Sequence, residues 1–139
     1  FTIPLGLADI KREGKDCTIV ARSMTVPLAL QAAEQIQNEF DVSVEVIDPR
    51  TIKPLDIDTI VNSIKKTNRL VIAEESHEFA SVGAEISYQV MDHAFDYLDA
   101  PIRRISTAET PMPYAKNLEA AALPSVDKIV AAVKEVCYL

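Results

Sequence analysis

The chain has 139 residues, of which 48% are hydrophobic, and it carries a formal net charge of −7. This length and composition suit one soluble globular domain, and no apolar run approaches the roughly 18 residues that span a bilayer. The acidic balance argues against nucleic acids and anionic membranes, which bind basic surfaces, and leaves a basic protein partner open.

The N-terminal residues Phe1–Leu5 contain neither an initiator methionine nor a basic stretch before an apolar one. We therefore expect no signal peptide, and we interpret residues 1–139 as a single-domain fragment of a longer subunit. Cys17 and Cys137 lie far apart and show no metal-binding spacing. We expect them to be buried thiols in a reducing compartment.

Strands and a helix are predicted in the first third of the chain. We expect an outer strand at Leu7–Lys11, a buried apolar strand at Cys17–Ala21 and an alternating strand at Val42–Val46. Between the last two strands, Thr25 and Pro27 mark the start of a helix. Its apolar face is formed by residues spaced four apart, namely Leu28, Ala32, Ile36 and Phe40.

A charged loop, Asp48–Asp56 with the sequence DPRTIKPLD, follows this strand. Its two prolines fix the backbone, so the loop is predicted to be a stiff crossover. Asp56 is expected to cap the next helix, since its charge lies at the helix N-terminus. The apolar face of that helix is predicted from Ile57, Ile60, Val61 and Ile64.

The remaining predicted elements continue the alternation. We expect a strand at Leu70–Ala73, a helix that opens at Gly83, an edge strand at Ile102–Ile105, and a last helix capped by Ser125. The stripe of the Gly83 helix is predicted to be Ile86, Val90, Ala94 and Leu98, and that of the last helix to be Val126, Ile129, Val130 and Val133.

Alternating strands and helices, with strands apolar on both faces, predict a three-layer α/β domain around a mainly parallel sheet. Residues 106–124 are the longest irregular stretch. A loop of this length is usually functional or packs on a neighbour. Within it, the proline-stiffened segment around Tyr114 either covers an edge of the core or forms an interface.

Candidate chemistry is sparse at the expected strand ends. No glycine-rich phosphate-binding motif is present. His77 follows a strand among acidic residues and is either a catalytic base or a surface histidine. Gly83, at a helix start, either helps to bind an anion, as in a small regulatory module, or permits a tight turn. The residues alone give no convincing active site.

Several motifs together resemble the C-terminal domain of the transketolase-like family. They are VEVIDPRTIKPLD, TIVNSIKKTNRLVIAEES and VGAEI, and the resemblance covers roughly residues 5–139. Within that family, FDYLDAPIRRI and TPMPYAKNLE resemble pyruvate dehydrogenase beta subunits. The equivalent domain of another 2-oxo acid dehydrogenase, or of 1-deoxyxylulose-5-phosphate synthase, is the alternative, although the MPYAK stretch argues against the synthase.

This resemblance implies a five-stranded, mostly parallel sheet with one antiparallel strand. It implies a full enzyme that uses thiamine diphosphate and Mg²⁺ to decarboxylate pyruvate and acetylate a lipoyl group. The cofactor-binding and catalytic residues would lie outside this chain, so the fragment alone is expected to be inactive. Departures at Pro49 and at Ser76–Glu78 favour a bacterial, cytoplasmic protein over one of the mitochondrial matrix.

The resemblance also implies an assembly and docking role. The implied partners are the alpha subunit, a second beta subunit and the subunit-binding domain of the dihydrolipoyl acetyltransferase. Asp99 and the carboxylate of Leu139 match the positions that dock this basic partner. Asp99 could equally be a turn residue, and Leu139 a frayed end. We further expect Arg50 to pair with a carboxylate while Pro49 and Pro54 fix the backbone at a domain or subunit contact.

Overall fold

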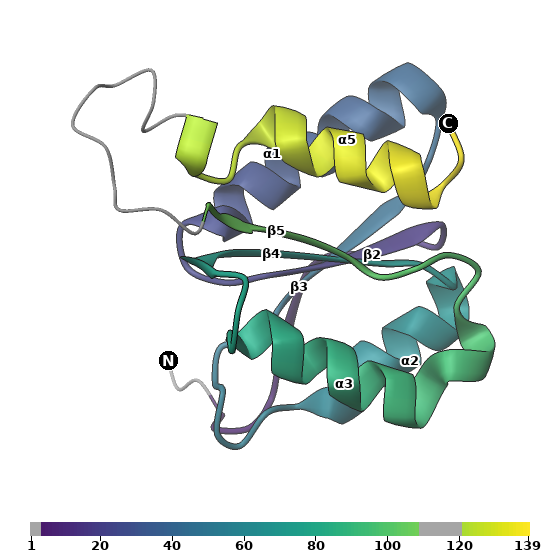
Figure 1. The fold of residues 1–139 in the computed structure, drawn as a ribbon. Helices are drawn as coiled ribbons and strands as arrows, with labels where there is room; N and C mark the ends of the chain where they lie inside the picture. Colours follow the sequence, from purple (N-terminus) through teal and green to yellow (C-terminus); the bar gives the residue numbers. More distant parts are fainter. Residues whose placement is uncertain (1–3, 109–120) are drawn as a thin grey trace.

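A computed structural model of the chain describes residues 4–108 and 121–139. One five-stranded sheet, in the order β1-β3-β2-β4-β5, lies between α1 and α5 on one face and α2 and α3 on the other (Figure 1). In chain order the elements are β1 (Asp9–Arg12), β2 (Cys17–Ala21), α1 (Thr25–Phe40), β3 (Val44–Asp48), α2 (Ile57–Thr67), β4 (Leu70–His77), α3 (Val82–Ala94), η1 (Phe95–Tyr97), β5 (Arg103–Thr107) and α5 (Val126–Val136).

The strand pairing matches the predicted mixed sheet. β2 pairs in parallel with both β3 and β4, and β4 pairs in parallel with β5. β1 is the one antiparallel strand and covers the outer edge of β3. The chain runs from β2 to β3 on one side of β2, and then continues to β4 and β5 on its other side. The direction in which successive parallel strands are added therefore reverses between β2 and β4. Ligands of open α/β sheets bind at such a reversal, outside the carboxyl ends of the strands.

The central strands are buried because helices cover both faces of the sheet. All five residues of β2 are buried, as are the first four of β3 and the first five of β4. The side chains of alternate strand residues join α1 and α5 in one apolar cluster and α2 and α3 in another. None of the described helices is long and apolar enough to cross a membrane.

Side-chain caps fix the starts of three helices. Asp56 accepts a hydrogen bond from the backbone N–H of Thr59, and Ser125 caps α5 in the same way through Lys128. Both caps are as predicted. Ser81 caps α3, so Gly83 lies in the first turn, one residue later than the start of the helix.

A buried carboxylate lies in the middle of the sheet. Glu45 in β3 is 1% exposed, and it accepts hydrogen bonds from Ser63 Oγ at 2.5 Å, Lys66 Nζ at 2.6 Å and the Gly14 N–H at 3.2 Å. Burial by itself would raise the pKa of Glu45, but these hydrogen bonds outweigh burial and lower the pKa. The ionised side chain therefore links β3 to α2.

Four element predictions need correction. α3 ends at Ala94 and a 3₁₀ turn follows, so Leu98 does not belong to the apolar face of α3. The chain then reaches Pro101, and helical backbone is disfavoured at the residue before a proline. β4 continues past the apolar run to His77. The strand placed at Val42–Val46 is β3 at Val44–Asp48, and it is buried on both faces where alternation was expected. Phe40 is 37% exposed, with Lys134 over its ring.

Candidate functional site

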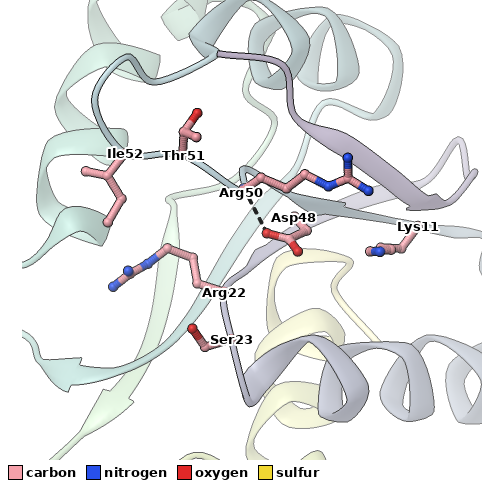
Figure 2. Close-up of a pocket in the computed structure, with 7 residues that line it drawn as sticks. All are labelled: Lys11, Arg22, Ser23, Asp48, Arg50, Thr51 and Ile52. Carbon is pink, nitrogen blue, oxygen red and sulfur yellow. Dashed lines mark hydrogen bonds between the residues drawn. The ribbon is translucent and has the colours of Figure 1, made fainter. Parts of the chain in front are cut away.

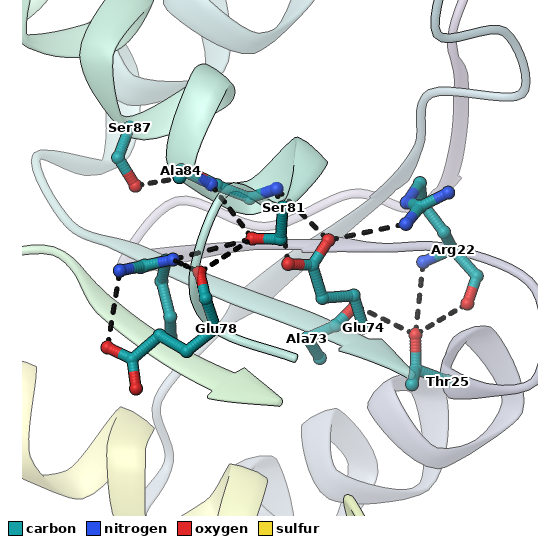
Figure 3. Close-up of polar contacts among 10 residues, drawn as sticks. Arg22, Thr25, Ala73, Glu74, Glu78, Ser81, Ala84 and Ser87 are labelled. Atoms are coloured by element: carbon teal, nitrogen blue, oxygen red, sulfur yellow. Dashed lines mark hydrogen bonds and ion pairs between the residues drawn. The ribbon is translucent and has the colours of Figure 1, made fainter. Parts of the chain in front are cut away.

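A buried acid organises the carboxyl end of β4. Glu74 is 1% exposed, and its carboxylate accepts hydrogen bonds from the Gly83 N–H, at 3.0 and 3.2 Å, and from Arg22 Nη2 at 3.3 Å (Figure 3). The anion at the N-terminus of α3 is thus the chain's own side chain. A Cβ atom on Gly83 would lie 2.6 Å from Glu74 Oε1, so the contact depends on a glycine.

Thr25 joins the start of α1 to the same end of the sheet. Its Oγ1 accepts a hydrogen bond from the Arg22 N–H at 3.0 Å and lies 2.7 Å from the Arg22 carbonyl and 2.8 Å from the Ala73 carbonyl (Figure 3). Together with the Arg22–Glu74 pair, these contacts hold the ends of β2 and β4 in one arrangement. One polar atom of the network has no such partner: Arg22 Nε is buried without a hydrogen bond.

A hollow of about 460 Å³ lies beside this network, at the carboxyl ends of β2 and β3 (Figure 2). Its lining residues are Lys11, Arg22, Ser23, Asp48, Arg50, Thr51 and Ile52. Ser23 and Arg50 have left-handed φ values of 53° and 59°, which are uncommon for residues other than glycine. Such conformations cluster at functional contacts, where the surrounding structure enforces them.

Arg50 is held in place by two aspartates. Its Nη2 lies 2.9 Å from Asp9 Oδ2, and its backbone N–H donates to Asp48 Oδ1 at 2.9 Å. Lys11 pairs with the same Asp9 at 2.7 Å, and these cations lower the pKa of Asp9, with the hydrogen bond from Lys11 as the largest cause. The loop that carries Arg50 is thereby tied to β1, and its Lys53–Pro54 peptide bond is cis.

His77 does not join an acid–base cluster. It is exposed at the end of β4, whereas Glu74 faces Gly83 and Glu78 pairs with Arg104 at 3.2 Å. Glu75, next to the buried Glu74, is exposed, because successive side chains of a strand point to opposite faces. Within residues 4–108 and 121–139, no group of three or more His, Cys, Asp or Glu side chains could hold a metal ion.

At the opposite end of the sheet, the structure brings Asp99 close to the C-terminal residues. The Asp99 N–H donates to the Asn68 carbonyl at 2.8 Å, and its carbonyl accepts from Tyr138 Oη at 3.1 Å. The Asp99 side chain is exposed, and Leu139 is 53% exposed. The Leu139 N–H donates to the Lys134 carbonyl at 2.9 Å, so this segment is hydrogen-bonded as far as its last residue.

Leu139 also borders a second hollow of about 460 Å³ on the outer face of α5, lined by Asp127, Val130, Ala131, Lys134, Glu135 and Leu139. We name the surface formed by Asp99, Tyr138, Leu139 and this hollow the C-terminal corner. Tyr114, predicted either to cover an edge of the core or to form an interface, lies outside the described residues. No sequence pattern signals the Tyr138–Asp99 contact, because an isolated tyrosine after a helix has no characteristic spacing.

The fold and these motifs define a known class of domain. The profile described as "Transketolase, C-terminal domain" matches residues 6–129, and the chain belongs to this family. In structure the chain resembles a split-gene transketolase described as an inactive beta4 tetramer, with a TM-score of 0.81, 25% identity, and coverage of 100% of this chain and 44% of that one. The predicted family and fold are confirmed.

Similar curated proteins belong to a narrower class within this family. The beta subunit of the pyruvate dehydrogenase E1 component of Rickettsia felis is 58% identical over 136 residues, which are 98% of this chain and 41% of that protein. The mitochondrial beta-2 subunit of Oryza sativa subsp. japonica is 54% identical over 138 residues, which are 99% of this chain and 36% of that protein. The chain thus spans less than half the length of these relatives.

Proposed function

We propose that the chain is the C-terminal assembly and docking domain of the beta subunit of a thiamine-diphosphate-dependent pyruvate dehydrogenase. The observation that supports this most is the identity of 54–58% to such subunits over nearly the whole chain. The full enzyme would decarboxylate pyruvate and transfer the acetyl group to a lipoyl group. It would lie in the cytoplasm of a bacterium or in the mitochondrial matrix of a eukaryote.

The family resemblance implies that the cofactors of that enzyme are held outside this chain. Among the described residues, no group of three or more His, Cys, Asp or Glu side chains could hold a metal ion. A diphosphate suits a helix N-terminus, but that of α3 already holds Glu74. We therefore place no step of the decarboxylation on these residues and assign thiamine diphosphate and Mg²⁺ to the other parts of the enzyme.

The C-terminal corner provides the features that docking of a basic domain requires. The Asp99 backbone is fixed on both sides by Asn68 and Tyr138, so its carboxylate is presented with little further loss of conformational entropy on binding. Tyr138 is 71% exposed, and exposed aromatic rings are typical of interface anchors. The charge of −7 would steer a partner rich in Arg and Lys towards the corner.

A titration with the subunit-binding domain of a dihydrolipoyl acetyltransferase tests this proposal. Asp99→Asn keeps the size of the side chain and removes one charge, and we expect it to weaken binding at least about tenfold, or 1.4 kcal/mol. Asp96→Asn is the matched control, because Asp96 is also exposed but lies in η1, outside the corner. Equal losses in both variants would show general steering without a docking site at Asp99.

The stiff loop supports the second part of the proposal, which is assembly. Arg50 is fixed by Asp9 and Asp48 in a left-handed conformation, and Thr51 Oγ1 donates to the Pro54 carbonyl at 2.9 Å. A loop already held this firmly loses little freedom when a second surface packs on it. We propose that Arg50 and Pro54 form a contact with another domain of the beta subunit, with a second beta subunit or with the alpha subunit.

A further inference from the structure

The two cysteines, distant in sequence, are brought together at one end of the sheet. Arg69 donates from Nε to the Val136 carbonyl at 3.0 Å and from Nη1 to the Asp16 carbonyl at 3.2 Å. These are the carbonyls of the residues that immediately precede Cys137 and Cys17. A guanidinium is planar and its nitrogens are fixed relative to each other, so Arg69 holds the two backbones side by side.

Both thiols belong to the same side of the sheet. Cys17 is fully buried in the apolar cluster between the sheet and α1 and α5, and Cys137 packs against that cluster while remaining partly exposed. Cys17 Sγ donates to the Thr18 carbonyl at 3.8 Å, and the two thiols lie close enough for each to shift the pKa of the other. Cys137 is therefore the more accessible of the two thiols to a small solute, and Cys17 lies in the interior of the cluster.

The surroundings distinguish the two sulfurs. The hydrogen bond from Cys17 and the nearby Arg69 charge lower the pKa of Cys137. The contact with Cys137 and burial raise the pKa of Cys17 well above its usual value. Asp16 is the neighbouring acid that opposes ionisation of both. A partly exposed thiol that ionises more easily, near a buried one, matches the arrangement of an attacking and a resolving cysteine.

We propose that Cys137 and Cys17 form a reversible thiol–disulfide pair that hydroperoxides oxidise. The Cys137 thiolate attacks the terminal oxygen of the hydroperoxide, so that an S–O bond forms, the O–O bond breaks, and an alcohol (water, from hydrogen peroxide) leaves with a proton. Cys17 Sγ then attacks the sulfenic sulfur. The S–S bond forms, the S–O bond breaks, and hydroxide departs with the Cys17 proton as water.

The position of Cys137 makes closure of the bond feasible. Cys137 is the C-cap of α5, where helical hydrogen bonding ends, and the following Tyr138 has a left-handed φ of 59°. A cap residue can shift relative to β2 without distorting the body of the helix. Cys17, within the central strand, can stay in place. This inference is independent of the docking function proposed above.

The test is peroxide oxidation of the folded 139-residue chain, followed by intact mass, titration of free thiols and peptide mapping without reductant. We expect loss of both free thiols, a mass lower by two hydrogens, a mapped Cys17–Cys137 peptide pair, and recovery of both thiols with dithiothreitol. Retention of both thiols, or disulfides only between separate chains, would overturn the proposal.

Two variants assign the roles of the cysteines. Cys17→Ala should stop oxidation at a sulfenic acid on Cys137, which dimedone traps. Cys137→Ser, changed at the partly exposed position, should keep its fold and slow the loss of the Cys17 thiol at least about tenfold. If Cys17 in this variant is oxidised as fast as in the parent chain, Cys137 is not the attacking thiol and the proposal fails. Thermal melting confirms that each variant is folded before oxidation.

Discussion

Gly83→Ala tests whether the contact between the Glu74 carboxylate in β4 and the first turn of α3 stabilises the fold. In an ordinary helix position, replacing Gly with Ala stabilises a protein by up to about 1 kcal/mol. Here the new Cβ would lie 2.6 Å from Glu74 Oε1 and 3.3 Å from Ile72 Cγ2, so the buried carboxylate must move. Its movement weakens the hydrogen bond from the residue 83 N–H.

The loss of one charge-assisted hydrogen bond costs about 1.5–3 kcal/mol, and the partly exposed Arg22–Glu74 pair adds little. After subtraction of the gain in helix propensity, we expect Gly83→Ala to lower the free energy of unfolding by about 1–2 kcal/mol, or the melting temperature by roughly 3–8 °C.

A double-mutant cycle with Glu74→Ala isolates the clash. Without the carboxylate, Gly83→Ala should become neutral or stabilising by up to about 1 kcal/mol, because only the close contact with Ile72 Cγ2 then opposes the gain in helix propensity. Urea unfolding of the four proteins gives the coupling free energy. If Gly83→Ala stabilises the parent chain, or has the same effect in both backgrounds, the reasoning about Glu74 is refuted.

Three further predictions concern other parts of the chain. The pKa of Glu45 is lowered from its usual value of 4.5, so the ionised side chain stabilises the fold fully above pH 4.5, and this stabilisation is lost as the pH falls through the pKa of the folded state. The urea midpoint should therefore fall more steeply with decreasing pH for the parent chain than for Glu45→Gln. Equal pH dependence of the two midpoints would contradict this. Gly14→Ala should abolish folding by circular dichroism, because its Cβ would lie 2.3 Å from the Val44 carbonyl carbon; a cooperative native melt would refute this. Arg50→Ala should reduce the stability of this chain by at most about 1 kcal/mol, since the pair with Asp9 is partly exposed. In the full-length beta subunit, the same change should impair folding of that subunit or its assembly with a second beta subunit or the alpha subunit; unchanged melting and unchanged assembly in size-exclusion chromatography would remove the proposed interface role.

The sequence predicted best what local patterns determine. The apolar run Cys17–Ala21 and the cap residues Asp56 and Ser125 have the same role in the structure as in the prediction, because burial on both faces and capping depend on neighbouring residues. The arginines at residues 103 and 104 correctly indicated an edge strand.

Contacts that depend on tertiary structure could not be predicted in this way. Glu45 interrupts an apolar strand and reads as a solvent-facing residue, but Ser63 and Lys66 from α2 satisfy its carboxylate in the interior. Likewise, Glu74 reads as one of several acids in a turn, and only the fold places Gly83 against it. Of the C-terminal corner, only Asp99 and Leu139 were predicted, and they were predicted from the family resemblance. Tyr138, which hydrogen-bonds to Asp99 and precedes Leu139, was missed.

The most direct test of the docking function is a calorimetric titration of the chain with the subunit-binding domain of a dihydrolipoyl acetyltransferase, beside a chain without Leu139. Removal of Leu139 moves the terminal carboxylate to Tyr138 and takes away the apolar side chain that borders the α5 hollow. We predict saturable binding by the intact chain that weakens as salt increases, and loss of binding in the truncated chain. Equal affinity of the two chains, or no binding by the intact chain, would contradict the account.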